Sequence, residues 1–168
     1  MNNSIALHTS RFIFLVLLQV LILNHINFLT YINPYLYVLF ILLYPISNNR
    51  QLFIFLSFLI GLSVDLFSDS GGIHAAASVT IAYSRPLFLK FAFGTSYEHL
   101  TVKITSAEFG QRLTYFTLMV LLHHIVLFTL EIFSTAYILL IFKKALFSSI
   151  FTILLCLIFT VLFSKNSK

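Results

Sequence analysis

The sequence contains few charges: Asp, Glu, Lys and Arg make up 9% of its 168 residues, against about a quarter in an ordinary soluble domain. Hydrophobic residues make up 60%, which is too apolar for the surface of a soluble fold of this size and too apolar for a disordered chain. A single cysteine, Cys156, excludes an intramolecular disulfide and any multi-cysteine metal site. Phosphate-cradling glycine loops and a Gly-x-Ser-x-Gly nucleophile motif are also absent. We therefore expect one all-α, polytopic membrane domain over residues 1–168, with no enzymatic activity, cofactor or metal.

Apolar runs separated by polar breaks predict about six transmembrane helices, since a helix needs about 20 residues to cross the hydrocarbon core. The expected spans are 12–30, 34–48, 51–67, 73–91, 112–133 and 145–163. Arg11 and the run after it resemble a signal peptide, but no small-residue cleavage site follows, so we expect an uncleaved first span. Residues 137–142 either extend the last span or lie at the interface. Residues 94–111 form a polar loop, in which 100–105 fits a short strand or an amphipathic surface segment.

The basic residues predict the orientation of these spans. With the N-terminus inside, eight of the ten Lys and Arg residues lie on the inner side: Arg11, Arg50, Arg85, Lys90, Lys103, Arg112, Lys165 and Lys168. Only Lys143 and Lys144 lie outside. This bias follows the positive-inside rule, so both termini and the 94–111 loop are expected in the cytoplasm. The scattered bases form no polybasic patch, and nucleic acid is not an expected partner.

The densest motif joins the third and fourth spans. Asp65 lies near the end of a span, where a carboxylate needs partners. The structural interpretation is a cap that accepts backbone N–H groups from the turn or the fourth span, and the functional one is a docking or ligand site. Gly61 and Gly72 allow close helix approach or a tight turn. Gly61, Asp65 and Asp69 also match the end of the metal motif of CDP-alcohol phosphatidyltransferases, but the upstream carboxylates of that motif are missing.

A second group of polar residues lies in the fifth span. His124 and Glu131 are seven residues apart and share a helix face, about 10.5 Å apart along the axis. The adjacent His123 points about 100° away. They form either interhelical hydrogen bonds that fix the bundle or a proton relay or metal site, although a metal needs more ligands. The tyrosines expected as interface anchors are Tyr31, Tyr35, Tyr37 and Tyr137.

Three short motifs carry a family resemblance: Gly61-Leu62-x-x-Asp65, Gly72-Ile73-His74-Ala75 and Ala82-Tyr83-x-Arg85. Together they resemble the rod shape-determining protein MreD family of bacteria. The fifth span, with the histidine pair and Glu131, and the segment 93–99 look like the Bacteroidetes branch of that family. Length, span number and charge layout agree with the family over essentially the whole chain.

The resemblance implies a non-enzymatic, multi-pass scaffold of the bacterial inner membrane that serves the peptidoglycan synthesis complex of cell elongation and maintains rod shape. The implied partners are the bitopic protein MreC and, directly or indirectly, the MreB filament, RodA and its transpeptidase. The positions singled out as partner-binding or structural are Gly61, Asp65, Asp69, Gly72, His74, Arg85, His124 and Glu131. Of these, Arg85 is expected to meet cytoplasmic partners, together with residues 90–112.

A second hypothesis remains open. The MreD family is similar in fold to the substrate-binding subunits of energy-coupling-factor transporters, which implies a small-molecule-binding membrane subunit as the alternative. That function requires a polar cavity within the bundle. The candidate lining residues are Asn24, His25, His74, His124 and Glu131.

Overall fold

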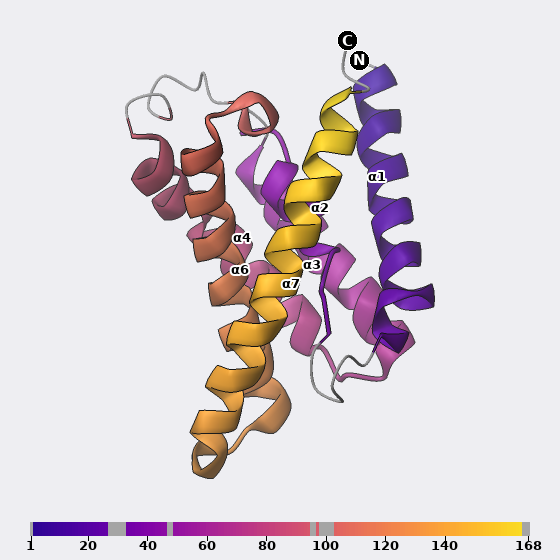
Figure 1. The fold of residues 1–168 in the computed structure, drawn as a ribbon. Helices are drawn as coiled ribbons and strands as arrows, with labels where there is room; N and C mark the ends of the chain where they lie inside the picture. Colours follow the sequence, from indigo (N-terminus) through magenta and orange to yellow (C-terminus); the bar gives the residue numbers. More distant parts are fainter. Residues whose placement is uncertain (1, 27–32, 47–48, 95–96, 98–102, 166–168) are drawn as a thin grey trace.

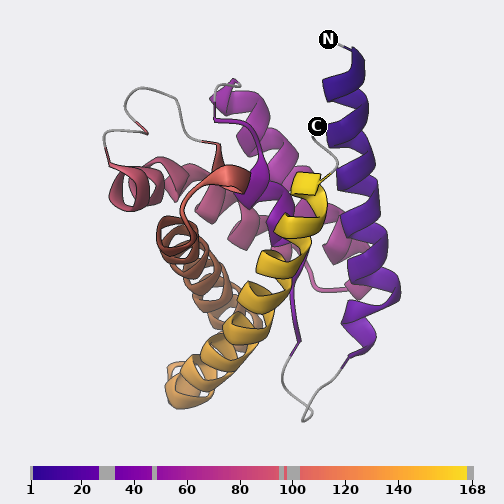
Figure 2. The ribbon, with the colours of Figure 1, turned by 45° about the horizontal axis from the view of Figure 1, so that its top comes forward.

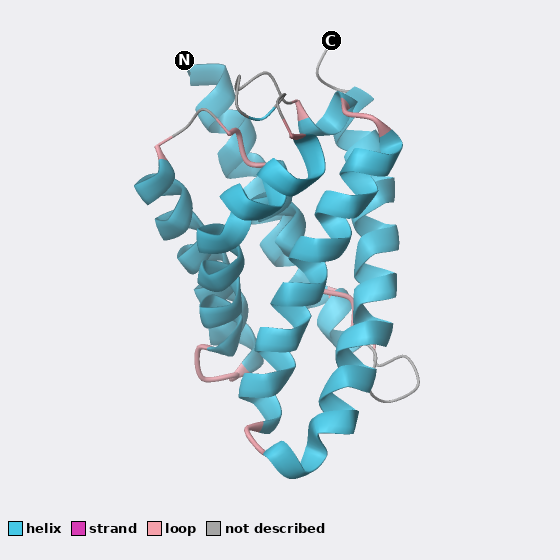
Figure 3. Cartoon of the chain, turned by 90° about the vertical axis from the view of Figure 1, so that its left-hand side faces the viewer, coloured by secondary structure: helices cyan, strands magenta, loops and turns pink. Residues whose placement is uncertain are grey.

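The chain is an all-α bundle in a computed structural model that describes residues 2–26, 33–46, 49–94, 97 and 103–165 (Figure 1). The helices are α1 (Asn2–Leu21), α2 (Val38–Leu43), α3 (Arg50–Ser68), α4 (Ile73–Phe93), α6 (Phe109–Ile132) and α7 (Ile138–Lys165). Three single 3-10 turns accompany them: η1 (Leu23–His25), η2 (Ile104–Ser106) and η3 (Thr135–Tyr137). No strand occurs among the described residues, which confirms the expected fold class (Figure 3).

Within the described part of the chain, four helical segments are long and apolar enough to cross a membrane: Ala6–His25, Arg50–Ser68, Phe109–Ile132 and Thr135–Leu162. They indicate a membrane-embedded protein. The fifth long helix, α4, packs between α3 and α6 and carries two basic residues and several small ones. The bundle therefore agrees with a polytopic membrane protein, while the expected count of six spans is approximate.

The helices leave two distinct ends of the bundle (Figures 1 and 3). The start of α1 and the end of α7 lie together at one end, which we name the termini end, and the η3 turn lies at the other, which we name the turn end. The end of α1 and the α3–α4 turn also lie at the turn end, where Asn24 Nδ2 donates to Ser68 Oγ at 2.8 Å. Figure 2 gives the same arrangement from a second direction, with α1 along one side.

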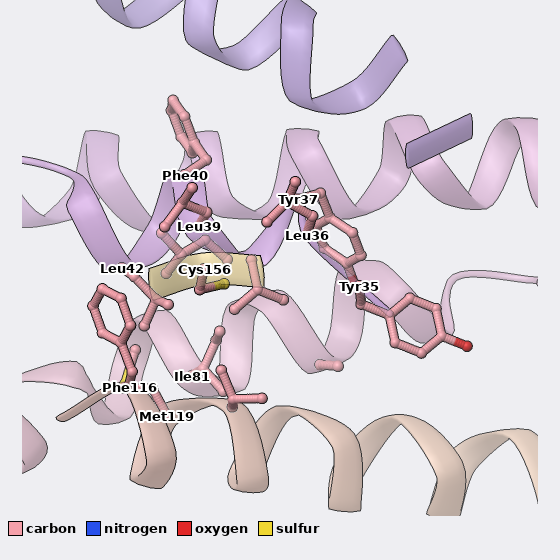
Figure 4. Packing of buried hydrophobic residues seen from close by; sticks show 14 of the residues in the cluster. Tyr35, Leu36, Tyr37, Leu39, Phe40, Leu42, Ile81, Phe116, Met119 and Cys156 are labelled. Atoms are coloured by element: carbon pink, nitrogen blue, oxygen red, sulfur yellow. The ribbon is translucent and has the colours of Figure 1, made fainter. Parts of the chain in front are cut away.

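The expected second span, 34–48, is not one transmembrane helix. Residues 33–37 contain no regular helix, α2 has only six residues, and residues 34–42 and Tyr44 are buried in the centre of the bundle. The residue before a proline avoids the helical region, and Tyr44, which precedes Pro45, has ψ 139° and ends α2. Tyr35 and Tyr37 consequently belong to the core rather than to an interface belt, as Figure 4 shows for both side chains.

Non-helical backbone inside a membrane protein needs hydrogen-bond partners from its neighbours. Gln19 of α1 supplies two: its Nε2 donates to the Pro34 carbonyl at 3.1 Å, and its Oε1 accepts from the Tyr37 N–H at 3.4 Å. Thr152 of α7 supplies a third, since its Oγ1 accepts from the Tyr35 N–H at 3.0 Å. The central segment is therefore held by the first and last helices of the chain.

The start of α7 decides between the two alternatives for residues 137–142, an extension of the last span or a segment at the interface. Because α7 begins at Ile138, residues 138–142 extend the last span, and Tyr137 is exposed just before it. Tyr31 lies outside the described residues. Gly94 ends α4 with φ 53°, and α6 begins at Phe109. Of the alternating segment 100–105, residues 100–102 lie outside the described part, and its end is the η2 turn.

Candidate functional site

Asp65 joins α3 to the start of α4 at the turn end. Its Oδ1 accepts hydrogen bonds from the His74 N–H at 3.0 Å and from Ser70 Oγ at 2.5 Å. Its Oδ2 accepts from the Ala75 N–H at 2.8 Å. The carboxylate, with 4% of the residue exposed, thereby satisfies free N–H groups at the N-terminus of α4, where the helix dipole also favours a negative charge. The structural interpretation of Asp65 as a cap thus describes its geometry.

Two glycines make this junction compact. A Cβ built on Gly61 would lie 2.6 Å from the Ala75 Cα and 2.6 Å from the His74 carbonyl oxygen, so only glycine lets α3 approach α4 this closely. Gly72, directly before α4, has φ 94°, a conformation that other L-residues rarely adopt. Asp69 ends α3 with φ 51°, and its side chain is exposed.

A hydroxyl bridge connects three elements deeper in the bundle. The Tyr37 hydroxyl lies 3.0 Å from His74 Nδ1 and 2.7 Å from His123 Nε2. A hydroxyl has one proton, so it donates to one imidazole and accepts an N–H from the other. Among the described residues, the buried Nδ1 of His123 has no hydrogen-bond partner. The bridge links the central segment to α4 and α6.

His124 faces a different neighbour from His123. Its Nδ1 lies 2.8 Å from the Val120 carbonyl oxygen. Because a carbonyl oxygen can only accept a hydrogen bond, Nδ1 is the nitrogen that carries the proton in neutral His124. Its Nε2 then accepts from Thr152 Oγ1 at 3.2 Å, while Thr152 accepts from the Tyr35 N–H. Three elements share one ordered chain of hydrogen bonds. The hydrogen bond between His124 and Thr152 is of the interhelical kind that the sequence analysis offered as one interpretation of His124.

Glu131 does not join His124 in a common site. Its Oε1 accepts from Lys144 Nζ at 2.7 Å, and the carboxyl side chain is 36% exposed. The same ammonium lies 5.1 Å from the centre of the Phe128 ring, a distance at which a cation–π contact forms. Glu131 and Lys144 therefore tie α6 to α7 at the turn end, while His124 contacts α7 further inside.

A polar cavity of about 680 Å³ opens at the turn end, between the ends of α1, α3 and α6 and the start of α4. Four of the five residues expected for a ligand cavity line it: Asn24, His25, His74 and Glu131. His124 is the exception, because it is buried behind Tyr35, whose ring also lines the cavity. Asp69 adds a second carboxylate, and no Lys or Arg is among the described lining residues.

Arg85 is buried inside the bundle, whereas the sequence predicted that it would be available to cytoplasmic partners. Only 4% of the residue is exposed. Its Nη2 donates to the carbonyls of Leu42, at 3.3 Å, and Tyr44, and its Nε donates to the Tyr115 hydroxyl at 2.9 Å. The physical reason is that the end of α2 presents unpaired carbonyls, which attract a cation.

Several residues that organise the site were not predicted as such. Gln19 is a lone amide in an apolar run, and Thr152 a lone hydroxyl near the middle of another, and such residues in a span usually face protein rather than lipid. That signal marks both as internal contacts, but it does not identify their partner. The position of Tyr37 depends on the central segment, which the sequence predicted as a transmembrane helix.

Comparison with protein-family models, with curated proteins and with solved structures finds no match for this chain. The assignment to membrane-embedded helical bundles therefore rests on composition and structure. The family resemblance rests on the sequence alone, and function has to be argued from geometry.

Proposed function

We propose that the chain is a non-enzymatic scaffold of the MreD kind, which holds partner proteins of the cell-elongation machinery for peptidoglycan. The observation that supports the proposal is the α3–α4 junction. The motif residues Gly61, Asp65 and His74 meet there in direct contact or hydrogen bonds, next to the turn at Gly72. A junction locked in this way gives the turn end a fixed shape, which a partner needs in order to recognise it.

The proposed location is the bacterial inner membrane, with the termini end in the cytoplasm. The positive-inside rule favours this orientation, because basic residues such as Arg50, Lys103 and Arg112 flank the described helices at that end. The turn end then faces outward with Asp69 and Glu131. A bitopic partner such as MreC would meet it there, while the MreB filament, RodA and its transpeptidase would be direct or indirect partners.

The first test is purification of the tagged full chain from native membranes in mild detergent, followed by mass spectrometry of the proteins that co-purify. We expect enrichment of a bitopic MreC-like protein and of lateral wall synthases. An ATPase module or a bound metabolite without wall proteins would contradict the scaffold.

A pair of variants links this test to the junction. Asp65→Asn removes the carboxylate that binds the start of α4, whereas Glu108→Gln removes the same charge from an exposed position before α6, at the termini end. We expect Asp65→Asn to lose the partner and Glu108→Gln to retain it. Equal retention by two well-folded variants would show that the junction does not organise the partner surface.

The cavity at the turn end favours a second candidate, a small-molecule-binding membrane subunit. Its volume of about 680 Å³ falls within the range of 300–1,000 Å³ that is usual for small-molecule sites. Its lining residues include Asp69, Glu131, His74 and Tyr35. Two acidic residues suit a polar or cationic ligand. Extraction of the purified protein with organic solvent, followed by small-molecule mass spectrometry, tests this candidate. A stoichiometric metabolite that disappears in Glu131→Gln would support it.

A further inference from the structure

At the termini end, two arginines line one small cavity, and neither has a carboxylate partner among the described residues. The cavity has a volume of about 200 Å³ and lies between the end of α2, the start of α3 and the second half of α4. Arg85 and Arg50 both line it, together with apolar side chains such as Ile46 and Leu89. This site is separate from the cavity at the turn end.

The guanidinium of Arg85 is only partly satisfied by the protein. Its Nε and Nη2 donate to a hydroxyl and two carbonyls, all of which are neutral acceptors, and its Cζ lies 4.7 Å from the centre of the Phe53 ring. Within the described part of the chain, Nη1 makes no hydrogen bond. A buried cation without a counter-ion is costly, and an anion in the adjoining cavity would lower that cost.

Arg50 supplies the second positive charge from the rim. It is exposed at the first position of α3, its Nη2 donates to the Tyr83 carbonyl at 3.3 Å, and its Cζ lies 5.1 Å from the centre of the Tyr83 ring. Two guanidinium groups on one cavity form a strong phosphate-binding arrangement, because their planar N–H donors match phosphate oxygens.

The position of the cavity indicates where the phosphate comes from. Arg50 begins a helix of membrane-spanning length, so the cavity lies near the level of lipid headgroups. The apolar walls suit the glycerol and first acyl carbons of a lipid, and the exposed side chains of Tyr83 and Leu87 on α4 leave its neighbourhood open to lipid. We propose that this cavity binds a phosphate group, supplied by the headgroup of an anionic phospholipid in the same leaflet.

The test compares lipids in native mass spectrometry and thermal-shift titrations of the full chain in neutral detergent. The probes are phosphatidylglycerol, phosphatidylcholine and inorganic phosphate. We expect one phosphatidylglycerol per chain, bound at least tenfold more tightly than phosphatidylcholine. Inorganic phosphate that competes at equal affinity would assign the same site to free phosphate, and weaker competition would assign it to lipid.

Variants localise the binding. Arg50→Gln changes an exposed side chain and is expected to fold, whereas Arg85→Gln also removes the donors to the end of α2. The matched control is Arg112→Gln, which removes the same charge at the termini end outside the cavity, where Nη1 of Arg112 donates to the Thr105 carbonyl. Arg50→Gln should weaken phosphatidylglycerol binding about tenfold, and Arg112→Gln should not. Equal affinity in the two variants, or no preference over phosphatidylcholine in the wild type, overturns the proposal.

Discussion

Replacing Gly61 with alanine should separate α3 from α4. The added methyl group would lie 2.6 Å from backbone atoms of His74 and Ala75, which is well inside van der Waals contact and cannot be relieved by rotating a side chain. Overpacking of this kind typically costs about 1–3 kcal/mol. Moving the helices apart also lengthens the hydrogen bonds that the Asp65 carboxylate accepts from the N–H groups of His74 and Ala75. The expected loss of stability therefore lies at the upper end of this range.

The matched control is Gly110→Ala in the first turn of α6. A Cβ on Gly110 meets no atom within 4 Å, so this variant tests the helix-propensity gain of alanine without a clash. Thermal unfolding in detergent, followed by intrinsic fluorescence or by size-exclusion after heating, gives Tm for both. We expect Gly61→Ala to lower Tm by roughly 6–12 °C and Gly110→Ala not to lower it. Equal Tm values for the two variants would refute the close packing derived for α3 and α4.

Three further substitutions test the polar contacts. Tyr37→Phe removes the hydroxyl that lies between two histidines and should cost about 1–3 kcal/mol in thermal unfolding, with an unchanged Tm counting against the bridge. Thr152→Val, nearly the same in shape, leaves the buried Tyr35 N–H without an acceptor and should cost a similar amount, visible as faster hydrogen exchange at that amide. Glu131→Gln breaks a partly exposed ion pair and should cost less than about 1 kcal/mol, and a larger loss that is insensitive to salt would show that Lys144 needs this partner for another reason.

The junction at the turn end was the part most accessible from sequence. A carboxylate near the end of an apolar run, followed by a Gly-Gly turn, predicts a cap on the next helix. Asp65 forms such a cap, since it accepts hydrogen bonds from the first N–H groups of α4. The close approach at Gly61 agrees with the same logic, since a glycine in a span often marks a helix crossing. Both features depend on residues that are near neighbours in the chain.

The prediction of a transmembrane helix over residues 34–48 was wrong, because composition cannot distinguish a buried irregular segment from a transmembrane helix. Pro34 and Pro45 bracket too few residues for a spanning helix, which was the available warning. The partners of the segment, Gln19 and Thr152, are far away in sequence and were not identified as such. Only the tertiary structure brings these groups together.

The burial of Arg85 was also not predictable from the sequence. The positive-inside rule uses charge as a marker of the aqueous side, and it treats every arginine as if it needed water or a carboxylate. Carbonyl groups at the end of a short helix meet part of that need for Arg85 inside the protein. No local pattern reports such an arrangement, because the carbonyls come from residues more than 40 positions earlier.

The hydrogen bond between Tyr35 and Thr152 has a consequence for biosynthesis. The two residues are 117 positions apart, and the acceptor lies on α7, which follows the other described helices in the sequence. Until α7 has entered the membrane, the Tyr35 N–H lacks this acceptor in a medium that offers no water. The irregular segment therefore reaches its final hydrogen bonding only after α7 has been inserted. A variant without α7 would leave this amide without its acceptor in the core, although the contacts with Gln19 of α1 could still form.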